Sequence, residues 1–263
     1  SRASLVVAVV GVPALLAMIR FWDPLHSLLG IRDLITHTNR TAVMLAMLLP
    51  VAAYWCHRRH GVGAMLVLAA AMIGAVFYSY SESAKLAVAV AIAVVGLHRL
   101  LGRPLIWGVG VLSALIILFA PYLGLHIFDL IPGWLLRNTS DLTFGVRGEI
   151  WREFSTLALL KPLIGWGIEA SSAPLSGLDA SKFSEAQRKV LEIGHTHNAP
   201  LQIWYEMGLV GAAVAAALVL AVTTRIARMA AGAEREVAFA VASAAFAISA
   251  VSHGVWQVWW YCL

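Results

Sequence analysis

The sequence predicts an all-α integral membrane protein, with about seven transmembrane helices and a long external loop that carries short amphipathic helices. The first observation is composition: 60% of the 263 residues are hydrophobic and 13% are charged, whereas a soluble domain has an apolar share of about 45–50%. The mean hydropathy of +0.81 agrees with this. The second observation is that the apolar residues form separate runs, close to the ~20 residues that a helix needs to cross the hydrocarbon.

The apolar runs lie toward both ends of the chain, with a longer polar stretch between them. Seven runs approach spanning length: residues 3–22, 41–56, 61–80, 84–101, 104–123, 199–222 and 236–262. The second run is short and contains Pro50, which allows a kinked or partly re-entrant helix. We expect helices 1–5 in residues 1–123, an external, periplasmic loop in residues 124–197, and helices 6 and 7 in residues 198–263.

Positive charge orients these helices, because short cytoplasmic loops retain Lys and Arg during insertion. Seven arginines follow the second, fourth and sixth runs: Arg58, Arg59, Arg99, Arg103, Arg225, Arg228 and Arg235. The opposite short connections carry three cations, Arg32, Arg40 and Lys85. This asymmetry predicts a cytoplasmic N-terminus and a long loop on the outer side. It accounts for the net charge of +5 without a nucleic-acid partner.

Two amphipathic helices are expected within the long loop. Residues 149–160 place an apolar stripe opposite a charged face, which is the pattern of a helix lying at the membrane interface, and Lys161-Pro162 ends it. A Ser-x-x-Gln capping box predicts a second short helix over residues 184–193. This second helix leads the chain to His195 and His197.

Polar side chains gather at the mouth of the sixth apolar run. The segment GHTHNAPLQIWYEMGLV begins with His195 and His197 and continues with Asn198, Gln202 and Glu206. Ionisable groups at membrane depth cost free energy, so this pattern favours chemistry at the membrane surface. The structural alternative is a pair of histidines that only cap the helix or snorkel.

Three cations are predicted on the same outer face as these histidines. Arg40 begins the second run, Lys85 begins the fourth, and Arg147 precedes the first amphipathic helix. Each cation by itself fits a snorkelling interfacial side chain. Together, the three cations and two histidines suit a multiply charged anion near the bilayer.

Three motifs follow one another in the second half of the chain. They are an Arg-x-x-x-Trp helix start at Arg147, a Pro-x-x-Gly-x-Gly turn at Pro162, and a His-Asn-x-x-x-Gln-x-x-x-Glu-x-Gly-x-x-Gly span at His197. Their order and spacing resemble the signature of the O-antigen ligase and O-antigen polymerase superfamily, over roughly residues 36–229. Members are multi-spanning glycosyltransferases that take a glycan from a polyprenyl diphosphate carrier, in bacteria usually undecaprenyl. They pass it to another saccharide, to lipid A core or in some cases to protein.

The resemblance implies a glycosyltransferase of the bacterial inner membrane, with its site facing the periplasm and a role in lipopolysaccharide or other polysaccharide biosynthesis. It implies that His197 is the catalytic histidine and that Arg147 binds the donor diphosphate. Lys85 and Arg40 are expected as further diphosphate ligands. Members usually have Ser-Arg where this chain has Ser83-Ala84-Lys85; a lysine keeps the charge but lacks the bidentate fork of arginine.

The remaining polar residues of the sixth run, His195, Asn198, Gln202 and Glu206, are expected to support the site. His197 is predicted as the general base in preference to His195 because it directly precedes Asn198 at the mouth of the helix. A histidine with an ordinary pKa near ~6.5 suits that role at neutral pH.

Transfer from a diphosphate carrier makes its own chemical demands. The leaving group is already a stable anion, so it needs charge stabilisation more than a proton. The acceptor hydroxyl must lose a proton to a base as it attacks. A single displacement inverts the anomeric centre and needs no second carboxylate, in contrast to glycoside hydrolases.

The His-x-His pair at 195 and 197 raises the alternative of a metal site. The sequence lacks an HExxH motif, a cysteine pair or a nearby aspartate cluster that would complete the coordination. We therefore predict no metal, no cofactor and a metal-independent reaction.

Two further patterns are interpreted as structural. Gly208 and Gly211, followed by several alanines, indicate close packing between helices. An interfacial aromatic belt is expected near the C-terminus, at His253, Trp256, Trp259 and Trp260.

The alternative function is a polysaccharide or lipid transporter, or an assembly subunit, without transferase activity. A transporter favours inverted repeats and broken helices at the membrane midplane, and the sequence shows no convincing inverted repeat. The chain begins at Ser1 without a methionine and is shorter than the usual superfamily members. We therefore expect it to be part of a longer protein.

Overall fold

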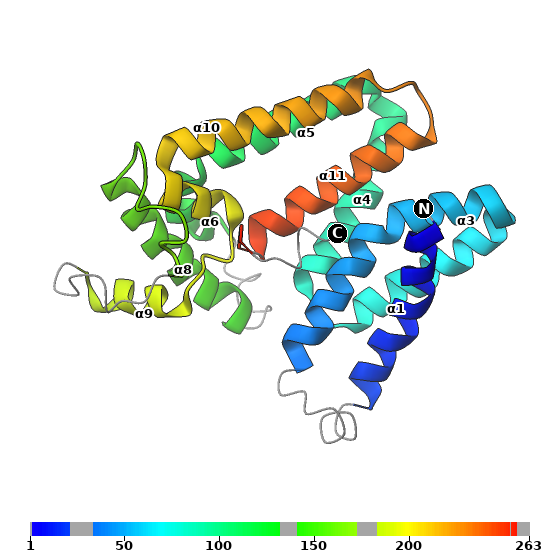
Figure 1. Cartoon of the computed structure of the whole chain (residues 1–263), viewed down its shortest axis with the longest axis horizontal. Helices are drawn as coiled ribbons and strands as arrows, with labels where there is room; N and C mark the ends of the chain where they lie inside the picture. Colours follow the sequence, from blue (N-terminus) through cyan, green and yellow to red (C-terminus); the bar gives the residue numbers. More distant parts are fainter. Residues whose placement is uncertain (1, 22–33, 132–140, 173–182, 253, 257–263) are drawn as a thin grey trace. The chain divides into compact units, whose positions relative to one another are not determined.

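Helices account for the regular structure of the chain (Figure 1). The computed structural model describes residues 2–21, 34–131, 141–172, 183–252 and 254–256, and these residues form no β-strand. The helices are α1 (Arg2–Arg20), α3 (Leu34–Tyr78), α4 (Glu82–Leu101), α5 (Arg103–Leu118), α6 (Ala120–Leu130), α8 (Asp141–Leu160), α9 (Glu185–Ile193), α10 (Ala199–Arg228) and α11 (Ala233–Val251). The predicted all-α class is confirmed.

The described residues contain fewer candidate membrane-spanning helices than predicted. Among the described residues, three helices are long and apolar enough to cross a membrane: Thr38–Tyr78 within α3, Glu82–Leu101, and Ala199–Arg228. The bent pair of α5 and α6 makes a fourth if it is counted as one span. The structure therefore supports a multi-pass membrane protein, and the prediction of about seven spans is not borne out.

Helix breaks explain part of this difference. The second and third predicted runs lie on the two sides of a break at Gly61 (φ 83°, ψ 179°), and not at Pro50, and together they form α3, which counts as one candidate span. Glycine adopts such a positive φ without the steric cost that a side chain brings. The fifth run is divided between α5 and α6, whose axes differ by 98°. The last run begins with charged residues in α11, and part of it lies outside the described residues.

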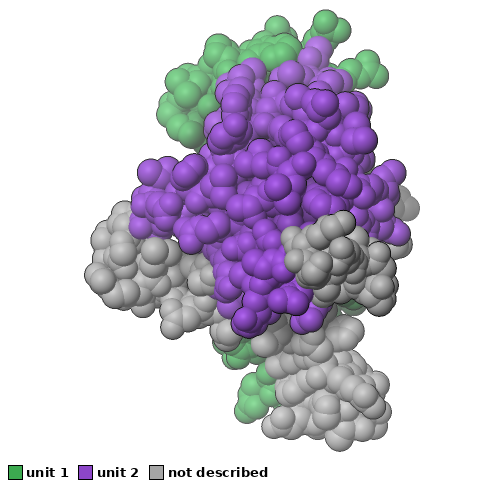
Figure 2. Space-filling view, turned by 90° about the vertical axis from the view of Figure 1, so that its left-hand side faces the viewer, with its two compact units in different colours: residues 1–107, 225–248, 263 green, residues 108–224, 249–262 purple. Residues whose placement is uncertain are grey.

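The chain divides into two compact units, which Figure 2 shows in different colours. Unit 1 comprises residues 1–107, 225–248 and 263, and unit 2 comprises residues 108–224 and 249–262. Within unit 1, α1 and α4 both pack against α3.

Polar contacts join the helix ends of unit 1 that carry the predicted cytoplasmic arginines. The Tyr54 hydroxyl donates to Glu234 at 3.0 Å. The Arg99 guanidinium donates to Glu236 at 2.9 Å. These bonds place the end of α4, a turn of α3 near Arg58, and the start of α11 together.

Within unit 2, α8 packs against α6 and α9. The apolar stripe of α8 is buried at Ile150, Phe154 and Leu157. The Phe154 ring lies 5.0 Å from the ring of Tyr205 in α10, edge to face. The stripe that the sequence placed at the membrane interface thus packs on other helices of the protein, because α6 and α10 cover it.

Two further contacts complete the frame of unit 2. The indole N–H of Trp204 in α10 donates to the carbonyl of Ile117 in α5 at 2.8 Å, and the two helices run side by side in Figure 1. The predicted capping box is present at α9: the Ser184 hydroxyl accepts from the Gln187 N–H, and the Gln187 side chain accepts from the Ser184 N–H.

Candidate functional site

The predicted polar motif lies where α10 begins. Asn198 precedes the helix, and its Oδ1 accepts the Leu201 N–H at 3.0 Å, which satisfies one of the free N–H groups of the first turn. α10 is interrupted at Gly208 (φ 61°, ψ −157°). We call residues 199–207 the short arm and residues 209–228 the long arm.

A loop from α8 closes this interruption by bonding to both arms. The N–H groups of Trp166 and Gly167 donate to the carbonyls of Tyr205 and Glu206 in the short arm, each at 2.9 Å. In return, two N–H groups of the long arm donate to the loop: Leu209 to the Pro162 carbonyl at 2.8 Å and Val210 to the Leu163 carbonyl at 3.2 Å. The loop therefore caps the end of one helix segment and the start of the next.

A glycine in α10 and a glycine in the loop allow the two backbones to approach this closely. A Cβ atom at Gly208 would lie 2.4 Å from the carbonyl carbon of Leu163, and one at Gly165 would lie 2.4 Å from that of Glu206. Both residues also have φ near +65°, at 61° and 67°. The prediction that Gly208 serves helix packing is thus corrected: Gly208 breaks its own helix and admits the backbone of a loop.

Glu206 is the centre of the hydrogen-bond network below this loop. Its side chain is buried, and the residue is 1% exposed. Oε1 accepts from the Ser171 hydroxyl at 2.6 Å and from Gln202 Nε2 at 2.9 Å. Oε2 accepts from the Glu169 N–H at 3.0 Å and from the Trp256 indole N–H. The two oxygens of one carboxyl group thus accept from four donors, which come from the short arm, residues 169–171 and Trp256.

Gln202 extends the network to the segment that follows α11. Its Nε2 also donates to the Ser171 hydroxyl at 3.0 Å, and its Oε1 accepts the Val255 N–H at 2.9 Å. Gln202 and Glu206 together hold residues 254–256 against the short arm. Trp256, predicted as part of an aromatic belt, thus has a partner inside the protein; His253, Trp259 and Trp260 lie outside the described residues.

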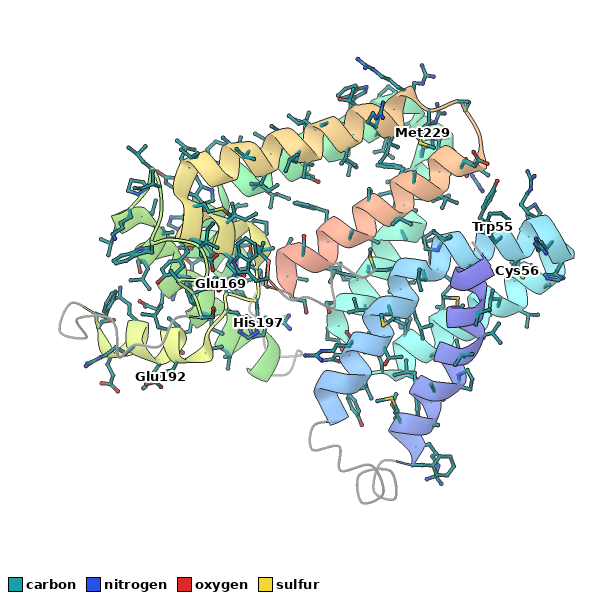
Figure 3. The ribbon with its side chains drawn as sticks, viewed as in Figure 1. Trp55, Cys56, Glu169, Glu192, His197 and Met229 are labelled. Carbon is teal, nitrogen blue, oxygen red and sulfur yellow. The ribbon has the colours of Figure 1, made fainter. Side chains whose placement is uncertain are left out.

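His197 (labelled in Figure 3) is held in an uncommon backbone conformation, with φ 52°. Few residues other than glycine adopt a positive φ, and such residues are found often at functional sites. Its Nδ1 lies 3.1 Å from the Ser252 carbonyl oxygen. A carbonyl can only accept, so Nδ1 carries the proton in the neutral ring and Nε2 keeps its lone pair.

His195 lies directly beside His197. The two ring centroids are 3.8 Å apart, with the planes tilted by 48°. Nδ1 of His195 faces the Ile193 carbonyl at 3.2 Å, so the same reasoning leaves Nε2 of this ring as the basic atom. The structure therefore places two imidazole rings together with the same tautomer.

The environment keeps both rings uncharged at neutral pH. Burial, the neighbouring His195 and, least of the three, the charge of Arg147 together lower the pKa of His197 to about 4. The bond to Ser252 opposes this shift. Burial also lowers the pKa of His195, against its bond to Ile193. His197 is thus present as a free base over the physiological pH range.

Arg147 lies in unit 2, as His197 does. It lies in α8, one turn before Trp151, and its charge disfavours protonation of His197. That effect requires the guanidinium to be near the imidazole. Arg147 and His197, which are fifty positions apart in the sequence, thus interact electrostatically, and their assigned roles remain a prediction.

The other two predicted cations lie in unit 1. Arg40 is exposed in the first turns of α3. Lys85 lies in the first turn of α4, where its ammonium pairs with Glu82 at 2.8 Å. Their participation in the donor site remains a prediction.

Sequence reasoning missed three partners of the site: the Ser252 carbonyl, Ser171 and the indole of Trp256. None belongs to a recognisable motif, and each is at least thirty positions from the residue that it contacts. The hydrogen-bond capacity of a buried glutamate was the one available signal, since Glu206 requires donors that the adjacent sequence does not supply. Among the described residues, no group of three or more His, Cys, Asp or Glu side chains is placed to hold a metal ion.

Comparison with known proteins finds a family that includes most of these site residues. A family model described as O-antigen ligase matches residues 67–216, more than half of the chain. This range includes Lys85, Arg147 and His197 but not Arg40. A protein of Rickettsia typhi named "putative polysaccharide ligase" is 28% identical over 112 residues, which are 42% of this chain and 27% of that protein. The chain thus spans about a quarter of the length of this curated relative, and no solved structure matches it significantly.

Proposed function

The chain belongs to the O-antigen ligase family, and we propose that it transfers a glycan from a polyprenyl diphosphate carrier to an acceptor hydroxyl. The observation that carries this proposal is a neutral histidine, His197, whose Nδ1 is held by the Ser252 carbonyl so that Nε2 is unprotonated, and whose pKa the charge of Arg147 helps to lower. In a membrane protein of this family, that pair matches the two demands of the reaction.

The base acts on the acceptor. Nε2 of His197 accepts the proton of the acceptor hydroxyl as the oxygen attacks the anomeric carbon, while the Nδ1–H bond to Ser252 fixes the ring. The imidazolium that forms is stabilised by the negative charge of the departing diphosphate. Losing such a positioned base lowers a rate by about 10²–10⁴.

The cations act on the donor. The guanidinium of Arg147 binds two phosphate oxygens and stabilises the charge that develops as the sugar–phosphate bond breaks. Lys85 and Arg40 are further candidates for this role. One direct displacement inverts the anomeric centre, and the reaction proceeds without a metal ion. Undecaprenyl is the carrier that we expect in a bacterial inner membrane, with a saccharide or lipid A core as acceptor.

The site faces the periplasm in this proposal. Support comes from the arginine asymmetry of the sequence and from unit 1, where the helix ends assigned to the cytoplasm contact one another through Tyr54–Glu234 and Arg99–Glu236. Single cysteines at Ala170 and Gly232 test the orientation. An impermeant reagent added to intact cells should label the first alone, and labelling of the second would reverse the topology.

A transporter is the competing function, and the break in α10 is a feature that transporters share. In transporters, however, the backbone groups freed by such a break face the substrate. Here two carbonyls of the short arm and two N–H groups of the long arm are bonded to residues 162–167. This occupancy favours the transferase.

The decisive experiment uses the purified chain in liposomes with a polyprenyl diphosphate glycan and candidate acceptors. Transfer of glycan to an acceptor, abolished by His197→Ala, is the expected result. Movement of the lipid-linked glycan across the bilayer without transfer would support the transporter instead.

A further inference from the structure

The loop that closes α10 carries an exposed apolar surface. Its residues Leu160, Leu163, Ile164 and Ile168, which we call the apolar loop, are between 64% and 75% exposed. An isolated exposed apolar residue is common in proteins. Four within nine positions of one loop form a patch that requires a partner.

The apolar loop continues an exposed apolar face of α10. In the long arm, Val210, Val214, Leu218 and Val222 are all exposed at four-residue spacing, which places them on one side of a candidate membrane span. Val210 donates its N–H to the carbonyl of Leu163, so the loop lies directly beside the first residue of this stripe. The two apolar surfaces are therefore continuous.

Much of the loop backbone is hydrogen-bonded within the protein. Pro162 has no N–H, and the N–H groups of Lys161, Gly165, Trp166 and Gly167 all donate to backbone carbonyls. The carbonyls of Pro162 and Leu163 accept from α10. Irregular backbone is tolerated at membrane depth when other protein groups satisfy it in this way.

A polar rim limits how deep the loop can lie. The Lys161 ammonium lies 4.1 Å from the centre of the Trp166 ring, and the Trp166 indole N–H donates to the Leu157 carbonyl at 2.8 Å. Lysine and tryptophan are typical of the headgroup region, where the cation also meets anionic phosphates.

We propose that the apolar loop inserts into the lipid bilayer just below the headgroups, where Leu163 and Ile164 contact acyl chains beside α10. Lipid is favoured over a protein partner because the patch is continuous with a membrane-spanning face and is bordered by a headgroup-type pair. The inference does not depend on the proposed transfer reaction.

Environment-sensitive labelling tests this placement. In a background of Cys56→Ala and Cys262→Ser, the variants Ile164→Cys and, separately, Leu163→Cys are labelled with NBD and placed in liposomes. Lys189→Cys, on the exposed face of α9, is the aqueous control, and Val214→Cys in the long arm is the lipid control.

The expected result is blue-shifted emission at Ile164 and Leu163, with several-fold stronger quenching by nitroxides on lipid acyl chains than at Lys189. Quenching by aqueous iodide at the level of Lys189 would overturn the proposal. Protection of both loop positions from iodide and from lipid nitroxides would also overturn it, because that result means burial under a protein or a second copy of the chain.

Discussion

Nδ1 of His197 lies 3.1 Å from the carbonyl oxygen of Ser252, fifty-five positions later in the chain. This bond determines which imidazole nitrogen is free to accept a proton. Ser252 lies close to residues 254–256, which are tied to the short arm by Gln202 and Glu206. The orientation of the predicted base thus depends on a network centred on a buried carboxylate.

Replacing His197 by Ala should lower the transfer rate by about 10²–10⁴ while donor affinity stays nearly normal, because the proton acceptor is lost and the cations remain. His195→Ala should have a smaller effect. The measurement is transfer rate together with donor binding for both variants. His57→Ala, at an exposed histidine of α3, is the control. If His195→Ala is the inactive enzyme, or if His197→Ala fails only in donor binding, the roles assigned here are wrong.

The pH dependence follows from the lowered pKa of His197. The neutral ring is the active form, so kcat/KM should be level across the neutral range and fall as pH drops through about 4. His195→Ala removes a neighbour that lowers this pKa, so the acid limb should move to higher pH. If kcat/KM of the unmodified protein instead falls near pH ~6.5, the ordinary pKa of histidine, the result would contradict the buried environment described here.

Stability should respond to the same titration. The folded state disfavours the charged ring, whereas the unfolded chain takes up a proton below about 6.5. His197 therefore destabilises the fold increasingly as pH falls from about 6.5 toward 4. The measurement is the thermal midpoint of the protein and of His197→Ala over that range; the variant should lose less stability on acidification.

Arg147→Lys should impair transfer although it conserves charge. Loss of one charge-assisted hydrogen bond costs about 1.5–3 kcal/mol, which is roughly a ten- to hundredfold loss in kcat/KM. Arg152→Lys is the matched control, because Arg152 lies on the same helix in an exposed pair with Asp129. Transfer should also survive a chelator. Full activity of Arg147→Lys, or loss with a chelator and rescue by one divalent ion, would refute this assignment.

Gly208→Ala should destabilise the protein by at least about 1–3 kcal/mol, since it combines a positive φ with a clash against the Leu163 backbone. Gly74→Ala in α3 is the control, because a Cβ there meets no heavy atom within 4 Å. Thermal unfolding in detergent measures both. Equal midpoints would mean that the loop does not pack against α10 as described.

Glu206→Gln should destabilise the fold and lower transfer, because an amide group cannot accept from all four donors and leaves a buried donor unpaired at a cost of about 1–3 kcal/mol. Trp256→Phe removes a single donor and should cost less. Glu192→Gln, exposed on α9, is the control. The loss in unfolding midpoint and in transfer rate should be largest for Glu206→Gln, smaller for Trp256→Phe and absent for Glu192→Gln. An unaffected Glu206→Gln would argue against the network.

Local sequence patterns predicted several elements correctly. The capping box at Ser184 and Gln187, the end of α8 before Lys161-Pro162 and the Asn198 start of α10 all depend on groups within a few positions of each other. Composition was sufficient for the all-α membrane class. The family motifs predicted Arg147 and His197 as site residues, and both lie in unit 2.

Tertiary structure decided the rest. The length of the apolar runs does not reveal that the second and third runs join in one long helix, α3, or that the fifth run is bent by 98° between α5 and α6. The described residues therefore hold fewer candidate spans than the seven predicted. The apolar stripe of α8 looked like a membrane surface because its cover, α6 and α10, is distant in sequence. The tautomer of His197, the donors of Glu206 and the pairing of the loop with α10 are contacts between remote segments. Such contacts join segments that are far apart in the sequence. No local pattern predicts them, because the partners come together only when the chain folds.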